Sequence, residues 1–211
     1  MKQDGNGWLP FCIVGLLAAV LAGCFSSSAP SRFYQLSSLE NQTSADHNVQ
    51  REHSVTVSIG PLRLPDYLEG PQMVTRSGRN ELKFSEFDRW AGSLESDIVR
   101  VLVENISALL PEDQFSVTRW SPTSESRTPS AFRVEVRVDR FEGALGGSVS
   151  LRAQWSLYAK DKGLLLKGEP IINEHVNDGS YNALVEAMSS ALERMSRDIA
   201  DGIRSAVTES K

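Results

Sequence analysis

The sequence predicts an α+β fold in which an antiparallel β-sheet is covered by two main α-helices, as a single domain that follows a signal peptide. Residues 131–141 alternate apolar and charged side chains, as a strand with one buried face does. Residues 91–110 and 180–205 instead carry apolar side chains at helical spacing. Removing residues 1–23 from the chain of 211 leaves enough residues for one well-cored domain.

The first segment of the chain has the features of a secretory signal. Residues 11–21 form an uncharged apolar run that is too short to span a bilayer and typical of a signal-peptide hydrophobic region. The following Leu21-Ala22-Gly23-Cys24 resembles the lipobox of bacterial lipoproteins. That resemblance implies cleavage between Gly23 and Cys24, a diacylglyceryl group on the Cys24 sulfur and an acylated amino terminus. The alternative is a buried signal-like helix with an incidental cysteine.

Composition narrows the possible partners and cofactors of the mature chain. The lipobox resemblance implies that Cys12 would leave with the signal and that Cys24 would carry lipid, which would exclude disulfides and thiolate metal sites in the mature chain. The net charge of −5 argues against nucleic acid as a partner, since phosphate backbones need clustered cations. Phe25 rather than Asp follows the cysteine, which by resemblance to other bacterial lipoproteins implies the outer membrane, facing the periplasm. We expect residues 24–31 to form a flexible tether and residues 32–211 to form the folded domain.

The amino-terminal half of the domain predicts strands, a hairpin and a helix. Residues 32–39 read as a short strand, residues 40–53 as a polar loop, and residues 55–59 as a strand that ends at Gly60-Pro61. Residues 71–90 predict a hairpin whose turn uses positive φ angles at Gly78 and Asn80. The helix over residues 91–110 ends at Pro111.

The carboxyl-terminal half predicts a three-stranded antiparallel meander and a long helix over residues 180–205. The glycine-rich residues 142–147 join the first two strands, and a tight turn at residues 161–163 leads to a third strand over residues 163–176. The side chains expected to face the core from the first two strands are Phe132, Val134, Val136, Val138, Val149, Leu151, Ala153, Trp155 and Leu157.

Three stretches together resemble one family of proteins. The run VSIGPLRLPDYLEGPQMVTRSGRNELKFSEFDRWAGSL is similar to the signature of the PqiC-type ABC-transport auxiliary lipoproteins, and FYQL and YNALVEAMSSALERMSRDIA resemble the family's first strand and last helix. The resemblance implies an outer-membrane-anchored, non-catalytic periplasmic subunit that docks a periplasm-spanning MCE-domain protein (PqiB-like) in a lipid-transport and membrane-integrity system. It also implies a homo-oligomer. The alternatives are a periplasmic lipid-binding carrier and an envelope hydrolase with an unrecognised site.

Two groups of residues are candidates for contact with partners. Two prolines stiffen the segment that follows the first long strand, and we expect a docking surface formed by Pro65, Tyr67, Leu68, Pro71, Gln72, Arg76 and Trp90. The alternative is a packed corner that stabilises the hairpin. Basic side chains around the hairpin can bind anionic lipid headgroups or acidic partner residues, or form an ordinary solvated face with Glu81, Glu86 and Asp88; they are Arg76, Arg79, Lys83 and Arg89.

No sequence motif for catalysis or metal binding is found. There is no Gly-x-Ser-x-Gly elbow, no phosphate-binding Gly-x4-Gly-Lys-Ser/Thr loop and no His-Glu-x-x-His. His47, His53 and His175 lie too far apart to predict a metal set, so we expect surface or structural histidines. We therefore expect no enzyme activity, no metal and no cofactor besides the covalent lipid on Cys24.

Overall fold

A computed structural model of the chain describes residues 30–39, 55–127 and 130–209. The chain divides into two units, residues 1–30 and residues 31–211, and every element named below belongs to the second. The predicted signal peptide, Cys24 with its predicted lipid, most of the predicted tether and the predicted polar loop over residues 40–53 lie outside the described residues.

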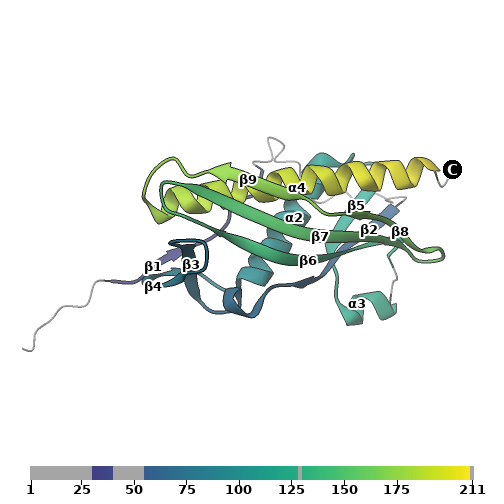
Figure 1. The fold of residues 1–211 in the computed structure, drawn as a ribbon. Helices are drawn as coiled ribbons and strands as arrows, with labels where there is room; N and C mark the ends of the chain where they lie inside the picture. The colour runs from purple at the N-terminus through teal and green to yellow at the C-terminus, as the bar shows by residue number, and fades with distance from the viewer. Residues whose placement is uncertain (1–29, 40–54, 128–129, 210–211) are drawn as a thin grey trace, which may run out of the picture. The chain divides into compact units, whose positions relative to one another are not determined.

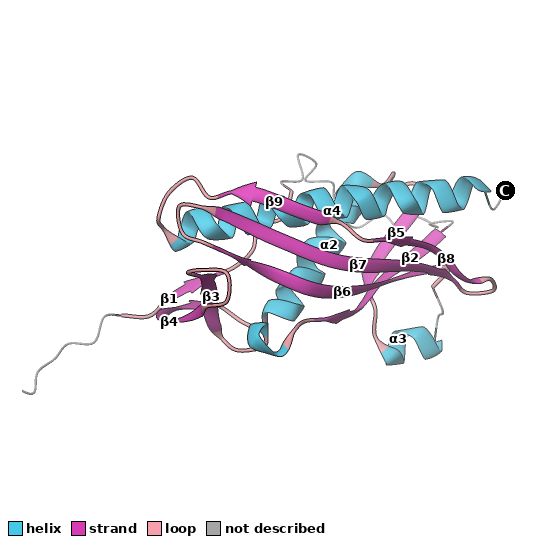
Figure 2. Ribbon diagram, viewed as in Figure 1, coloured by secondary structure: helices cyan, strands magenta, loops and turns pink. Residues whose placement is uncertain are grey.

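The described part of the second unit contains a sheet of nine strands (Figures 1 and 2). One path through it runs β1-β4-β3-β6-β2-β5, and β7 pairs with β6, β8 and β9. The strands are β1 Arg32–Tyr34, β2 Val55–Arg63, β3 Gln72–Arg76, β4 Leu82–Trp90, β5 Phe115–Arg119, β6 Phe132–Gly143, β7 Ser148–Ala159, β8 Gly163–Gly168 and β9 Ile171–His175.

The α+β class is confirmed, whereas the sheet is mixed rather than purely antiparallel. The predicted hairpin β3–β4 and the meander from β6 onward are antiparallel. In contrast, β2 is parallel to both β5 and β6, and β1 is parallel to β4. Two parallel strands must be joined by a long crossover connection, so they lie far apart in the sequence. Local sequence patterns therefore do not predict which strands pair in parallel. The strand β5 and the short helix α3, Pro122–Arg127, were not predicted from the sequence.

Two long helices, α2 Leu94–Leu109 and α4 Tyr181–Glu209, contact each other and cover one face of the sheet (Figure 2). The predicted inward side chains of β6 and β7 are all buried beneath them, as periodic burial requires. The Ser93 side chain caps α2 by accepting a hydrogen bond from the Ser96 N–H, so this helix begins later than predicted. Among the helices in the described ranges, none is both long and apolar enough to cross a membrane.

Two predicted strand boundaries are wrong. The strand β2 continues through Gly60-Pro61, because a bulge between Ile59 and Leu62 absorbs both residues, with Gly60 at a φ of 123°. The predicted strand over residues 163–176 is divided into β8 and β9, which pair with successive stretches of β7. Pro170 lies between them, and proline has no N–H to donate to a ladder.

The turn of the hairpin β3–β4 also differs from the expectation. Neither Gly78 nor Asn80 has a positive φ. The connection spans residues 77–81, which is longer than the two-residue turns that require such angles, and the Ser77 N–H closes it on the Glu81 carbonyl.

The predicted strand over residues 32–39 is limited to β1, and residues 35–39 instead form a strap across α2 and α4. The Leu36 N–H donates to an Asp97 carboxylate oxygen at 2.7 Å, and the Leu39 N–H donates to the Asn105 amide oxygen at 2.7 Å. Arg100 in turn donates to the Leu36 carbonyl at 2.6 Å. Side chains thus replace a strand partner for this part of the backbone.

Candidate functional site

The predicted docking residues form one corner beside the hairpin β3–β4. The 3-10 helix η1, Asp66–Leu68, begins after Pro65, and the Trp90 N–H closes the corner by donating to the Pro71 carbonyl at 2.9 Å. Leu68 and Trp90 are buried in the core. The side chains of Pro65, Tyr67, Gln72 and Arg76 are half-buried, and Pro71 is exposed. A partner at this corner would therefore contact Pro71 and the outer parts of the half-buried side chains.

The corner is joined to the sheet by a buried carboxylate, Glu142 of β6, whose side chain is only 1% exposed. It accepts hydrogen bonds from the Tyr67 hydroxyl at 2.7 Å and from Arg76 Nε at 2.9 Å and Nη2 at 2.7 Å. Arg140 Nε lies 2.9 Å from the same carboxylate. We call Glu142, Tyr67, Arg76 and Arg140 the Glu142 cluster. Burial, followed by the hydrogen bond to Glu142, raises the pKa of Tyr67 well above its usual range.

A register shift in β6 explains why Arg140 and Glu142 face away from the helices. Up to Val138, the even-numbered residues of β6 point at the helices. A bulge between Val138 and Arg140 reverses the alternation, so Phe141 enters the core while Arg140 and Glu142 project from the other face. The consecutive charged residues Asp139 and Arg140, which interrupt the alternation of apolar and charged residues, are the sequence signal of this shift.

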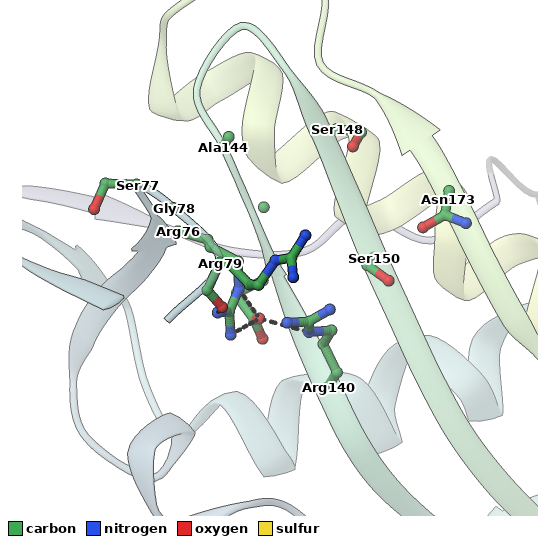
Figure 3. A pocket seen from close by; sticks show the side chains of 11 residues that line it. Arg76, Ser77, Gly78, Arg79, Arg140, Ala144, Ser148, Ser150 and Asn173 are labelled. Atoms are coloured by element: carbon green, nitrogen blue, oxygen red, sulfur yellow. Dashed lines mark hydrogen bonds and ion pairs between the residues drawn. The ribbon is translucent and has the colours of Figure 1, made fainter. Parts of the chain in front are cut away.

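A cavity of about 580 Å³ lies next to the cluster, on the sheet face away from the helices (Figure 3). Its walls come from the hairpin loop with Arg79, from β6 with Arg140, from β7 with Ser150 and from β9 with Asn173. Arg76 links the loop to β6, because its Nη1 donates to the Arg79 carbonyl at 2.9 Å while its other nitrogens bind Glu142. Of the polar side chains in this lining, sequence reasoning had identified only Arg76 and Arg79.

The structure separates the basic side chains that the sequence groups around the hairpin. Arg76 and Arg79 line the cavity, whereas Lys83 and Arg89 lie on β4. Asp88, expected on the same solvated face, is instead buried and binds Arg32, Tyr34 and Ser85 through its carboxylate. Burial favours the neutral acid, but these hydrogen bonds outweigh it and lower the pKa of Asp88.

A second cavity of about 500 Å³ lies at the start of α2, and its lining includes Gln35, Trp90, Asp97, Arg100 and Arg119. Asp97 and Arg100 pair with each other and also hold the strap, so this cavity belongs to its attachment. His175 is exposed on β9, and His47 and His53 lie outside the described residues. Within the ranges that the structure describes, no group of three histidine, cysteine or acidic side chains is placed to hold a metal ion.

Comparison with known proteins identifies the family. Residues 34–200 match the family of ABC-type transport auxiliary lipoprotein components. The chain belongs to this family. It is 23% identical to the intermembrane transport lipoprotein PqiC of Escherichia coli over 192 residues, which cover 91% of this chain and 96% of that protein. The protein of the same name from Shigella flexneri matches with the same identity and coverage.

Solved structures show the same fold. A crystal structure of a protein described only as uncharacterized superposes with a TM-score of 0.67 at 20% identity and covers 83% of this chain and 99% of its own. A protein from Xanthomonas campestris superposes with a TM-score of 0.61 at 12% identity and covers 81% of this chain and 93% of its own. The family predicted from the signature stretches is thus confirmed, and the α+β architecture recurs in solved proteins.

Proposed function

We propose that this chain is a periplasmic lipoprotein subunit, anchored in the outer membrane through Cys24, which docks an MCE-domain partner in trans-envelope lipid transport and catalyses no reaction. The observation that carries the transport role is the family match across residues 34–200. The relatives named as intermembrane transport lipoproteins, which align along almost their whole length, support the same role.

Exposed aromatic side chains support a docking surface at the end of the sheet where β1, β3 and β4 gather (Figure 1). Phe33 of β1 is 65% exposed and Phe84 of β4 is 54% exposed. Register places Phe33 beside Arg89, and Arg89 beside Gln72 at the edge of the Pro71 corner. Aromatic residues and arginine are each enriched in protein interfaces. We call Phe33, Phe84 and Pro71 the docking face.

The lipid-carrier alternative receives less support from the geometry. Both described cavities are lined largely by polar and charged side chains. A carrier for acyl chains needs an enclosed apolar cavity.

Affinity capture from gently solubilised envelopes tests the docking role. We expect the tagged full-length protein to recover an MCE-domain protein, and the double variant Phe33→Ser/Phe84→Ser to lose it. Leu164→Ser is the matched control, because it removes an exposed apolar side chain of β8 far along the sheet from β1. Equal recovery by all three proteins would contradict the docking face. Tightly held lipid without that partner, measured in the same eluates, would favour the carrier.

We further propose that copies of the chain self-associate through the outer edge of β5. The Trp120 N–H donates to the Ile59 carbonyl of β2. Because backbone N–H groups point to alternate sides along a strand, the N–H groups of Thr118 and Ser116 also point at β2, and the N–H of Val117 points outward. Among the described strands, no other strand pairs with that edge. Val117→Pro removes the outward donor and is tolerated on an edge strand, so native mass spectrometry should show smaller assemblies. Unchanged assemblies would reject this edge.

A further inference from the structure

We propose that the cavity between residues 77–81 and the strands β6, β7 and β9 is a binding site for a phosphate group. This site goes beyond the docking role, because Arg76 is the one predicted docking residue in its lining and because it needs no partner protein. The cavity has an excess of positive charge, neutral hydrogen-bond donors in its lining and a loop that is held in place.

The cavity is positively charged, whereas the chain as a whole is negatively charged. Three guanidinium groups, those of Arg76, Arg79 and Arg140, line it together with one carboxylate, that of Glu142, whereas the whole chain carries a net charge of −5. Glu142 is already saturated, because it accepts from Tyr67 and Arg76 and lies against Arg140. Arg79 forms no ion pair within the described part of the chain. Its charge is therefore available to an anion.

Neutral donors also line the cavity. Glu142 lies in register with Ser150, and Ser150 with Asn173, which places these side chains in one row across β6, β7 and β9. Figure 3 shows Ser148, Ser150 and Asn173 on the side of the cavity formed by β7 and β9, away from Ser77 and Gly78 of the hairpin loop. Hydroxyl and amide groups complete the hydrogen bonding of phosphate oxygens, and the planar guanidinium fork matches them in pairs.

The loop that carries Arg79 is organised before any ligand binds. Arg76 holds the Arg79 carbonyl, and Glu142 fixes Arg76 in turn. A preorganised donor set loses less entropy on binding than a mobile one. Through Arg76, the buried Glu142 therefore orients the loop that carries Arg79. It does so without neutralising the Arg79 side chain.

Two sources can supply the phosphate group, namely a phospholipid headgroup and a soluble phosphate. The cavity of about 580 Å³ is larger than a bare phosphate ion and falls in the range of small-molecule sites. Two exposed apolar residues are neighbours of the lining in sequence: Leu145 follows Ala144, and Ile171 lies two residues before Asn173 on β9. This rim can accept the first carbons of an acyl chain.

Titration of the full-length protein in an uncharged detergent tests the proposal. The probes are inorganic phosphate, glycerol phosphate and a short-chain phosphatidylglycerol, and an acidic peptide without phosphate serves as the competing ligand. We expect saturable binding of the phosphate compounds that weakens as salt screens the charges. Arg79→Gln should weaken it by about tenfold or more, because one charge-assisted contact is lost. Asn173→Ala, which leaves the Glu142 cluster intact, should weaken it less.

Arg137→Gln is the matched control. Arg137 is exposed on β6, the strand that carries Arg140, and it pairs with Asp139 outside the cavity. It should bind as the unmodified protein does. Tighter binding of the phosphatidylglycerol than of inorganic phosphate, lost in Leu145→Ser, supports a lipid source; equal binding of both supports a soluble one. No saturable binding, an equal loss in Arg137→Gln, or binding of the acidic peptide alone would overturn the proposal. Because capture of the partner is measured separately, failure here leaves the docking role untouched.

Discussion

Replacing Glu142 with glutamine should destabilise the folded domain far more than its single position suggests. The variant keeps the shape of the side chain but removes the charge that holds Tyr67, Arg76 and Arg140 together. Removing one partner of a buried ion pair typically costs about 3–5 kcal/mol. The side chains of Arg76 and Arg140 are 25% and 35% exposed, so water recovers part of that loss. We therefore expect the free energy of unfolding to fall by about 2–3 kcal/mol.

Thermal unfolding of the full-length protein in detergent, followed by circular dichroism, measures this change. For a domain of this size, each kcal/mol lowers the Tm by about 2–4 °C, so Glu142→Gln should lower it by about 4–12 °C. The control is Glu135→Gln on the same strand, which breaks the half-exposed pair with Arg133 and should cost less than about 1 kcal/mol. A Glu142 variant as stable as the unmodified protein, or a Glu135 variant that is equally harmed, would refute the reasoning.

Tyr67 adds a dependence on alkaline pH to the same test. Its pKa is raised in the folded state, so the folded protein retains a phenolic proton that the unfolded chain releases near pH 10. The resulting stabilisation is fully present below about pH 10 and is lost as the pH rises through the folded pKa. Tyr67→Phe should therefore flatten the alkaline decline in stability, and an unchanged slope would show that Tyr67 is not its source.

Three further changes probe the anchor, the attachment of β1 and the core. Cys24→Ala should leave an uncleaved, mislocalised precursor, and normal maturation in the outer-membrane fraction would reject the lipoprotein anchor. The pKa of Asp88 is lowered, so its stabilisation is present above about pH 4 and lost as the pH falls through the folded value; Asp88→Asn should make urea unfolding less sensitive to acid. Gly202→Ala should destabilise α4 by about 1–3 kcal/mol despite better helix propensity, because the new methyl group would lie 2.6 Å from the Trp155 indole. Gly179→Ala, which meets nothing within 4 Å, is the control, and equal melting temperatures would contradict the clash.

The elements predicted correctly are those whose burial is one-sided and continuous in sequence. The strands β6 and β7 alternate inward and outward residues, and α4 carries an apolar stripe, so local periodicity reports their packing directly. The strand β5 was missed because its five residues give a short pattern, and its parallel partner β2 lies far away in the sequence. Pairing of this kind is decided by tertiary packing rather than by local propensity.

The candidate site was only half predictable for a related reason. Pro65, Pro71 and the arginines of the hairpin stand out as residue types, and the structure does bring Arg76 and Arg79 together. Glu142 does not stand out, because regular alternation from Val138 would place it on the core face. The bulge moves it to the other face, where distant residues neutralise it. Two of its partners, Tyr67 and Arg76, lie far away in the sequence, so the residues around Glu142 do not by themselves predict that it is buried and paired.

The attachment of β1 links the proposed anchor to the proposed docking face by a short path. The chain enters the domain at β1, which is parallel to β4 and ion-paired to it through Arg32 and Asp88. The strand β4 pairs in turn with β3, which leads back to the Pro71 corner and Glu142. Tension between a lipid anchor and a docked partner would thus pass from β1 to its neighbouring strands and, through the strap, to α2. In the proposed role, the ion pair of Asp88 and the strap on α2 resist removal of β1, and both hold a segment whose own three residues form too short a strand to be stable alone.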